Sequence, residues 1–402
     1  MRAIAALMVF AVHLPWVYRL AADNPVLPYF QQLNVGVAVF FLISGFLLYR
    51  PFARTRYAGD RLQATLPYAE RRALRLFPAY WVALAGAVVL VGKSGEAVTA
   101  TPVLSVHGAL AYFPLMQVYD SNTLLGGISA AWTLSVELSF YVMLPLWAML
   151  LRRVPCNSPR EFLRSELVAL GALFVVGVAW TSVAAAQKAP GAAAFVDVTL
   201  IQPWLYVLPG YLDQFALGMA LAVLSVVVVD RTEAPKPVRV VDRASWLPWL
   251  VAALVFLVLG NVIDWLPGRT AQIIAIHELQ GIFALALLLP AVFGDADRGL
   301  VRRLLANRVL LWIGLVSYGV YLWHVAIMSK LADLGALGGP DTVGFSALAL
   351  ALTLLVAAAS FYGIERHALR LGRRLSHRRR SQDADMRMRD LPQHERPEPG
   401  GP

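Results

Sequence analysis

The sequence has little charge and almost no cysteine. Of its 402 residues, 15% are Asp, Glu, Lys or Arg and 58% are hydrophobic, whereas soluble domains carry about 25% charged residues. The single cysteine, Cys156, excludes an internal disulfide and a cysteine-based metal cluster. Walker, HExxH and GxSxG motifs are also absent. This composition is typical of an all-α integral membrane protein and gives no sign of the enzyme classes that those motifs mark.

The positive charge lies between the apolar runs. The formal net charge is +10, but the arginines gather in short segments between apolar runs and in the C-terminal tail, which is the positive-inside pattern. We therefore expect the lipid bilayer, and not nucleic acid, as a partner, and a multi-pass protein of the inner (plasma) membrane. The first run lacks a basic leader and a small-residue cleavage site, so no cleavable signal peptide is expected.

Apolar runs predict about ten transmembrane helices. The first covers Met1–Leu20, and the others cover 34–49, 76–91, 131–151, 167–186, 204–229, 246–262, 273–293, 309–328 and 343–364. The stretch 105–119 is too short and too polar to cross, so we expect one re-entrant or interfacial element there. With this topology, the arginine-rich loops and both termini are cytoplasmic.

The C-terminal tail differs in composition from the rest of the chain. Residues 372–402 are rich in Arg, Asp, Pro and Gln and poor in apolar residues. Such a segment cannot bury enough apolar surface to fold alone. We therefore expect one transmembrane domain over residues 1–371 and a disordered basic cytoplasmic tail over 372–402, with its arginine run against anionic headgroups.

The first predicted helix carries two groups that a membrane rejects. Arg2 and His13 are eleven residues apart, which is roughly three helical turns and places both on one face, about 16 Å apart. An ionisable residue inside a spanning helix costs about 2.5–3.5 kcal/mol and normally faces the bundle interior. The alternatives are a snorkelling arginine and a core histidine with its hydrogen bonds satisfied. The shared face favours a functional pair.

Two further clusters lie where spans meet the membrane surface. Glu137 lies about two turns into its span, so its carboxylate is either paired or faces water; a carboxylate that reaches the headgroups is the alternative. Arg71, Arg72 and Arg75 converge at the start of another span and suit a phosphate, which arginine binds with two hydrogen bonds. Ordinary binding of lipid headgroups is the competing explanation for these arginines.

Polar residues also interrupt the later spans. Ser317, Tyr321 and His324 stand at i, i+4 and i+7 and form one polar stripe, which serves either a site or helix association. Glu365 and Arg366 fit an ion pair at the end of the last span. Polar residues near the outer ends of two other spans are interpreted as interfacial, namely Asp213, Gln214, His277 and Glu278.

These stretches together resemble the acyltransferase-3 family of integral-membrane acyltransferases, which contains bacterial O-antigen and peptidoglycan O-acetylases. The family patterns match, in order, Arg2 with His13, Phe40–Phe46 (FFxxSGF), Arg71–Pro78 (RRxxRxxP), Trp132–Glu137 (WxLxxE), Ser317–His324 (SYxxYLxH) and Tyr362–Arg366. Two departures are visible. Family members usually carry a few residues before the first arginine, and a second carboxylate often follows the WxLxxE glutamate, where this chain has Leu138.

The resemblance implies an enzyme that moves an acyl group, acetyl in the first place, from cytoplasmic acyl-CoA to a hydroxyl. The acceptor would be a cell-surface glycan, a glycolipid or a small-molecule secondary metabolite, and no metal is expected. His13 would be the general base and Glu137 would orient the acceptor or His13. The donor phosphates would be bound by Arg2, Arg71, Arg72 and Arg75. The residues expected to support the site are Trp132, Ser317, Tyr321 and His324.

A transporter or flippase for a glycan or lipid precursor is the alternative function. In that case the polar face of the first helix would line a translocation route. The sequence gives it less support, because no pair of broken helices occurs at matching positions of two halves.

Overall fold

The computed structural model describes residues 1–15, 24–60, 62, 64–92, 101–187, 203–229, 236–293, 300–334 and 342–375. Over these residues the chain is a helical bundle without strands. The helices are α1 (Arg2–Val12), α3 (Leu27–Gln32), α4 (Val35–Tyr57), α5 (Thr65–Val91), α6 (Val106–Tyr112), α7 (Trp132–Leu151), α8 (Pro159–Ala186), α9 (Leu212–Val229), α10 (Lys236–Arg243), α11 (Trp246–Trp265), α12 (Arg269–Phe293), α13 (Leu300–Leu305), α14 (Arg308–Asp333) and α15 (Thr342–Ser360). A π-helix, Phe361–Glu365, follows α15.

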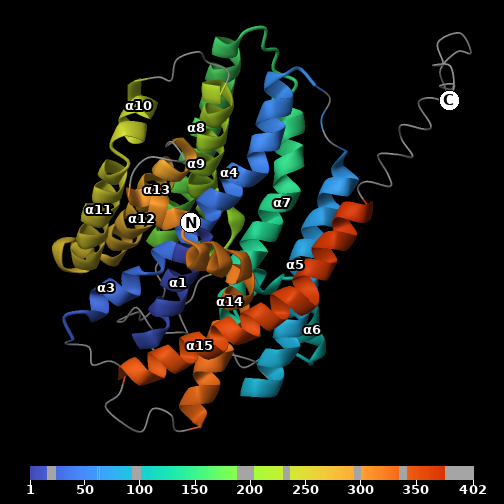
Figure 1. The fold of residues 1–402 in the computed structure, drawn as a ribbon, viewed down its shortest axis with the longest axis vertical. Helices are drawn as coiled ribbons and strands as arrows, with labels where there is room; N and C mark the ends of the chain where they lie inside the picture. The colour runs from blue at the N-terminus through green and yellow to red at the C-terminus, as the bar shows by residue number, and fades with distance from the viewer. Residues whose placement is uncertain are drawn as a thin grey trace, which may run out of the picture.

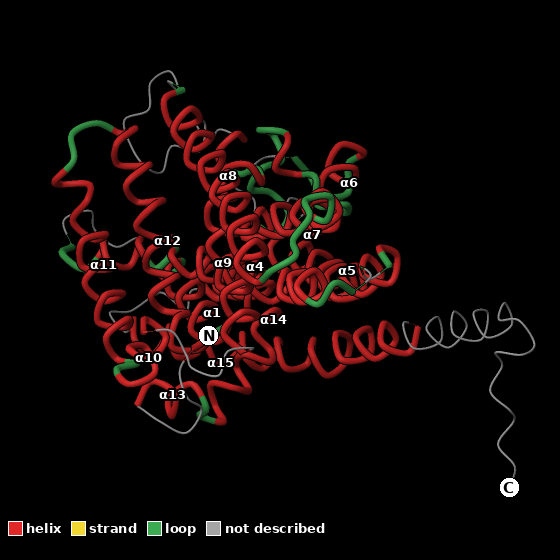
Figure 2. Tube along the Cα trace, turned by 90° about the horizontal axis from the view of Figure 1, so that it is seen from above, coloured by secondary structure: helices red, strands yellow, loops and turns green. Residues whose placement is uncertain are grey.

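Helix α1 lies in the middle of the bundle. It packs against α4 on one side and α14 on the other (Figures 1 and 2). α9 packs along α4, and α8 and α12 pack against α9, while α5 and α15 contact α14. Several residues of the short α1 are buried, including Ala5, Ala6 and Phe10. The first residues of the chain therefore pack against helices from its early part, α3 and α4, and from its late part, α14.

Glycines allow the close approach of the central helices. A Cβ on Gly36 of α4 would lie 2.6 Å from the carbonyl oxygen of Ala5 in α1. A Cβ on Gly45 would lie 2.5 Å from the carbonyl oxygen of Phe215 in α9. Small residues at helix interfaces are the usual device for close packing in membranes, because a larger side chain would push the backbones apart.

The prediction of an all-helical membrane protein is confirmed, and each predicted apolar run contains a helix. Within the described residues, eight helices are long and apolar enough to cross a membrane, and α1 and Trp246–Val262 of α11 are apolar but shorter. The chain is thus a multi-pass membrane protein. The number of crossings and the side on which the termini lie stay predictions. In the stretch 105–119, the seven-residue α6 and a turn of 3-10 helix replace a long helix.

Two boundaries differ from those predicted. Helix α1 ends at Val12 and His13 caps it, whereas one continuous helix to Leu20 was expected. Leu14 and Pro15 are helical again, and Pro15, which lacks an N–H and whose ring crowds the preceding turn, accounts for the break at His13. Residues 16–23 lie outside the described part. The arginine-rich stretch 50–75, expected as a loop, is largely helical, because α4 and α5 continue past their apolar runs. Arginine is a good helix former, so nothing ends these helices where their apolar runs end.

The predicted tail is described only at its start. The helix that follows the π-helix continues to residue 375, so residues 372–375 are helical. Residues 376–402, which hold most of the predicted disordered tail, lie outside the described residues.

Candidate active site

Three cavities lie along α1. The arginine cavity, about 510 Å³, is bordered by Arg2 and Arg75. The middle cavity, about 40 Å³, is bordered by Arg2 and Tyr321. The histidine cavity, about 420 Å³, is bordered by His13 and again by Tyr321. Because neighbouring cavities share lining residues, the two ends of α1 face one series of spaces through the bundle.

The arginine cavity collects positive charge from three parts of the chain. Its charged lining residues are Arg2, Arg75, Glu365, Arg366 and Arg373. The last three come from the π-helix and the helix after it, and with Tyr362 and Leu369 they follow the three- and four-residue spacing of one helix face. Glu365 interacts electrostatically with Arg75 and Arg2. Four guanidinium groups face one carboxylate here, so the cavity suits an anion with several charges.

Arg2 has an unsatisfied hydrogen-bond donor at this site. Its Nε atom is buried and has no hydrogen-bond partner. Arg75 repels it, while Glu137 and Glu365 attract it. A buried donor without a partner is costly, and an anionic ligand in the arginine cavity would satisfy it.

The three arginines predicted to act together, Arg71, Arg72 and Arg75, have different surroundings. Arg75 borders the arginine cavity. The guanidinium of Arg72 instead lies over the rings of Tyr68, at 5.6 Å, and Tyr141, at 5.9 Å. Arg71, which precedes Arg72, lies close to Gly372 of the last helix. One member of the triad therefore faces the cavity, and another is held by aromatic rings beside it.

Glu137 lies beside Arg2 and away from His13. It borders the middle cavity and accepts hydrogen bonds from Ser44 Oγ and Tyr141 O–H, each at 2.7 Å. It is not among the residues that border the histidine cavity. Ser317, also on the middle cavity, donates to the carbonyl of Gly314 within its own helix at 2.9 Å.

His13 and His324 form a hydrogen-bonded pair at the other end of α1. His324 is buried, and its Nδ1 faces the carbonyl oxygens of Tyr321, at 2.9 Å, and Val320, at 3.1 Å. Carbonyls only accept, so this nitrogen carries the hydrogen, and the Nε2 of neutral His324 is an acceptor. That Nε2 lies 3.2 Å from the Nδ1 of His13.

The same reasoning fixes the tautomer of His13. Its Nδ1 lies 2.8 Å from the carbonyl oxygen of Val9, so Nδ1 carries the hydrogen and donates toward Val9 and His324. The basic lone pair of neutral His13 is then on Nε2. His13 borders the histidine cavity, and a ring with one nitrogen fixed as donor and the other left basic has the protonation state that a general base requires.

The rest of the histidine cavity is lined by aliphatic, amide and aromatic side chains. Trp132 packs against Tyr206 and Tyr211 with ring centroids 5.0 and 5.5 Å apart. Tyr321 donates from its hydroxyl to the carbonyl of Ala130, which anchors α14 to the start of α7. Other lining residues carry amides, namely Gln31, Gln32, Asn34, Gln214 and Gln280. Aromatic faces and amides suit a ligand that carries hydroxyl groups.

A loop beside this cavity is held by an acidic residue. Oδ1 of Asp120 accepts the backbone N–H of Asn122 at 2.9 Å, and its Oδ2 pairs with His107. The hydrogen bond from the Asn122 backbone, with a smaller contribution from His107, holds the pKa of Asp120 below its usual value. The chain then continues to Leu125 and Ser129, which border the histidine cavity.

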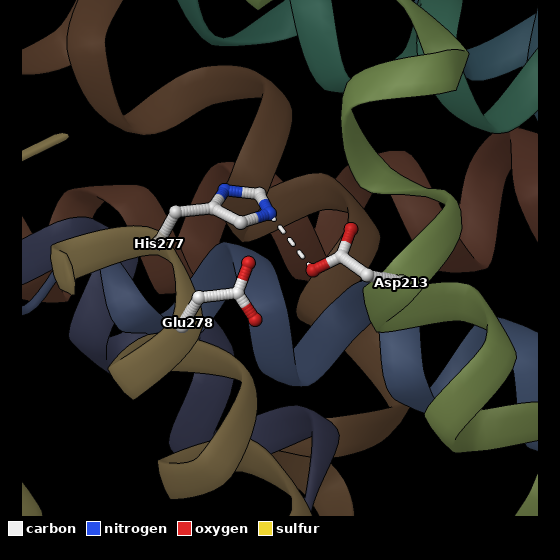
Figure 3. Close-up of side chains that lie close together, drawn as sticks. All are labelled: Asp213, His277 and Glu278. Carbon is white, nitrogen blue, oxygen red and sulfur yellow. Dashed lines mark hydrogen bonds and ion pairs between the residues drawn. The ribbon is translucent and has the colours of Figure 1, made fainter. Parts of the chain in front are cut away.

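The sequence analysis missed one cluster. Asp213 of α9 and His277 and Glu278 of α12 point toward one another (Figure 3), with His277 Nε2 2.9 Å from Asp213 Oδ2. His277 borders the histidine cavity. Asp213 and His277 are 64 positions apart in the sequence, and no sequence motif joins them. The one available signal was that two separate spans each place an acid near the same end.

Comparisons with known proteins find similarity over most of the chain. The model of the family described as "Acyltransferase domain" matches residues 1–362. The chain is 28% identical to nodulation protein 10 of Rhizobium leguminosarum bv. viciae, over 91% of this chain and 88% of that protein. It is 27% identical to the acyltransferase MdmB of Streptomyces mycarofaciens, over 89% and 87%, and 26% identical to the exopolysaccharide production protein ExoZ of Rhizobium meliloti, over 84% and 90%. No solved structure matches the chain.

Proposed function

The chain belongs to the acyltransferase family whose model covers residues 1–362, and on that premise we propose that it moves an acetyl group from acyl-CoA to a hydroxyl. The acceptor is a cell-surface glycan, a glycolipid or a secondary metabolite. One observation carries this proposal: Arg2 and His13, at the two ends of one short helix, border cavities of opposite chemical character.

The arginine cavity is proposed to bind the anionic part of the donor. A coenzyme A donor carries several phosphate charges, and four guanidinium groups face this space. Arginine binds phosphate with paired, charge-assisted hydrogen bonds. The unpaired Nε of Arg2 supports an anion at this position. Arg75 and Arg2 are the first residues assigned to donor binding, and Arg72 is proposed to act through its stacked position.

His13 is proposed to be the general base. Its Nε2 takes the proton from the acceptor hydroxyl while the oxygen attacks the thioester carbonyl. The carbon–sulfur bond then breaks, and the leaving thiolate takes that proton from Nε2. One proton and one acyl group thus move, and His13 returns to its starting state. A positioned base of this kind contributes about 10²–10⁴-fold to a rate.

Glu137 and His324 are proposed to position the two reacting parts. Glu137 is among the charges that attract Arg2, so its place favours a role on the donor side over direct contact with His13. His324 accepts from the Nδ1 of His13, which orients the ring. Trp132 and Tyr321 are assigned to the wall that receives the acceptor, and Ser317 to the middle cavity.

The direct test uses the purified protein in proteoliposomes with acetyl-CoA labelled in the acetyl group. Lipid and glycan extracts and a panel of hydroxyl compounds are offered on the other side, and labelled products are identified by mass spectrometry. We expect a labelled ester that requires both the donor and His13. Movement of a glycan or lipid across the bilayer without an acyl donor, and with no labelled product, would instead favour the transporter.

A further inference from the structure

The Asp213–His277–Glu278 cluster places three ligand-type side chains together near the histidine cavity. Each offers one atom, and these atoms lie within 4.8 Å of one another. The side chains come from two helices, α9 and α12, and converge on one space (Figure 3). Asp213 is 1% exposed, so the cluster is set into the bundle and does not lie on an open surface.

Its hydrogen-bond acceptors are not satisfied. Oδ1 of Asp213, Oε1 of Glu278 and Oε1 of the neighbouring Gln214 are all buried without a hydrogen-bond partner. The ion pair of Asp213 is with His277, whose charge depends on protonation. Buried carboxylates are expensive unless they are paired or coordinate a metal. Three unsatisfied oxygens near one histidine therefore favour a positive charge at this point, beyond any that His277 itself carries.

The geometry fits a small divalent cation. The 2.9 Å between His277 Nε2 and Asp213 Oδ2 is close to the separation of about 3.0 Å between adjacent ligands at right angles on an ion with bonds of about 2.1 Å, whereas tetrahedral ligands would lie about 3.4 Å apart. The backbone at Asp213 is also held firmly, because a Cβ on Gly177 of α8 would lie 2.4 Å from its nitrogen and 2.8 Å from its Oδ1. One imidazole with two carboxylates suits Zn²⁺ or Mn²⁺ better than Mg²⁺ or Ca²⁺, which prefer oxygen alone.

We propose that Asp213, His277 and Glu278 bind one divalent transition-metal cation that ties α9 to α12 at the wall of the histidine cavity. No metal was expected from the sequence, where these residues are interpreted as interfacial. The ion's proposed role is to hold the wall that presents His277 and Gln214. The transfer chemistry assigned to His13 does not require it, so the two proposals can fail separately.

The test measures metal in the protein directly. The full chain is purified in detergent with an affinity tag that contains no histidine and without chelator, and its metal is measured by inductively coupled plasma mass spectrometry. After treatment with EDTA, Zn²⁺, Mn²⁺ and Mg²⁺ are each titrated by calorimetry and by thermal unfolding. We expect about one equivalent of Zn²⁺ or Mn²⁺, a higher unfolding temperature with that ion, and no such effect of Mg²⁺.

Variants separate this site from adventitious binding. Asp213→Asn and His277→Ala should lose the bound metal, and Glu278→Gln, which keeps the Asp213–His277 contact, should weaken binding about tenfold or more. His107→Ala is the matched control, since it removes a second, more exposed His–Asp pair and should leave binding unchanged. Each variant is first checked by gel filtration, and Glu278→Gln decides the matter if the other two do not fold. Substoichiometric metal in the wild type, or equal binding by wild type and Glu278→Gln, would overturn the proposal and leave a simple hydrogen-bonded His–Asp pair.

Discussion

The two large cavities beside α1 have similar volumes, about 510 and 420 Å³, but opposite chemistry. The arginine cavity has four guanidinium groups and one carboxylate on its wall. The histidine cavity has amides, aromatic rings and imidazoles. The arginine cavity therefore suits a charged ligand and the histidine cavity suits a neutral one that forms hydrogen bonds. The same eleven-residue helix, α1, contributes to both cavities.

This difference indicates how one bundle can bind two unlike molecules. Charge-assisted hydrogen bonds are worth about 1.5–3 kcal/mol each, roughly twice a neutral one, so the arginine cavity should dominate the affinity for the donor. On the proposed function, the neutral cavity would bind less tightly per contact but would place the acceptor next to a base. Changes at the two ends should accordingly affect different kinetic constants.

The largest expected effect is on the rate, through the histidine cavity. His13→Ala should lower the transfer rate about 10²–10⁴-fold, because the acceptor hydroxyl loses its base. Binding of labelled acetyl-CoA, measured separately, should stay within about twofold of wild type. An equal loss of donor binding would show that the two ends are not independent.

The next effect belongs to the arginine cavity. Arg75→Ala removes one guanidinium group from the donor phosphates and should raise the KM for acetyl-CoA roughly tenfold to a hundredfold, with a smaller change in kcat. Arg153→Ala is the control, because Arg153 is exposed just beyond α7. If both substitutions had the same effect, general attraction of the donor by surface charge would explain the result.

A smaller effect is expected for the residue behind the base. His324→Leu removes the acceptor for the Nδ1–H of His13 and should lower kcat about fivefold to tenfold, the value of one hydrogen bond, with KM for the donor unchanged. His324→Gln supplies an amide oxygen and should recover part of the activity. A purely structural role predicts no such recovery and a lower unfolding temperature in both variants.

The smallest effect concerns the loop beside the histidine cavity. The folded-state pKa of Asp120 lies below its usual value of 3.8, so its contribution to loop stability is full above that pH and is lost as the pH falls through the lowered pKa. Amide hydrogen exchange of residues 117–124 should therefore quicken, relative to the intrinsic rate, only in strongly acidic solution. Asp120→Asn should remove this dependence, and a variant with the wild-type pH profile would assign the effect to another group.

The sequence predicts the helices well and their ends poorly. Apolar runs mark every long helix, because the membrane imposes length and composition together. Where a helix continues past its apolar run, as α4 does to Tyr57, no such constraint applies and hydropathy misplaces the boundary. The break at His13 had a local signal in Pro15, which the apolar run around it obscures.

For the site, helical spacing reaches only residues on one helix. The shared face of Arg2 and His13 and the stripe from Ser317 to His324 follow from periodicity, and both border the cavities or the base. Contacts between helices do not follow from it. The pairing of Glu137 with Ser44, the His13–His324 hydrogen bond and the convergence of Asp213 with His277 all depend on how distant helices pack.

The short length of α1 bears on how far apart the two cavities lie along the membrane normal. Eleven residues rise only about 16 Å, roughly half the hydrocarbon thickness of about 30 Å. If donor and acceptor enter from opposite faces, the protein need not swing open from one side to the other. In that case the distance over which the acyl group must pass would be set by one small helix and not by the full hydrocarbon layer.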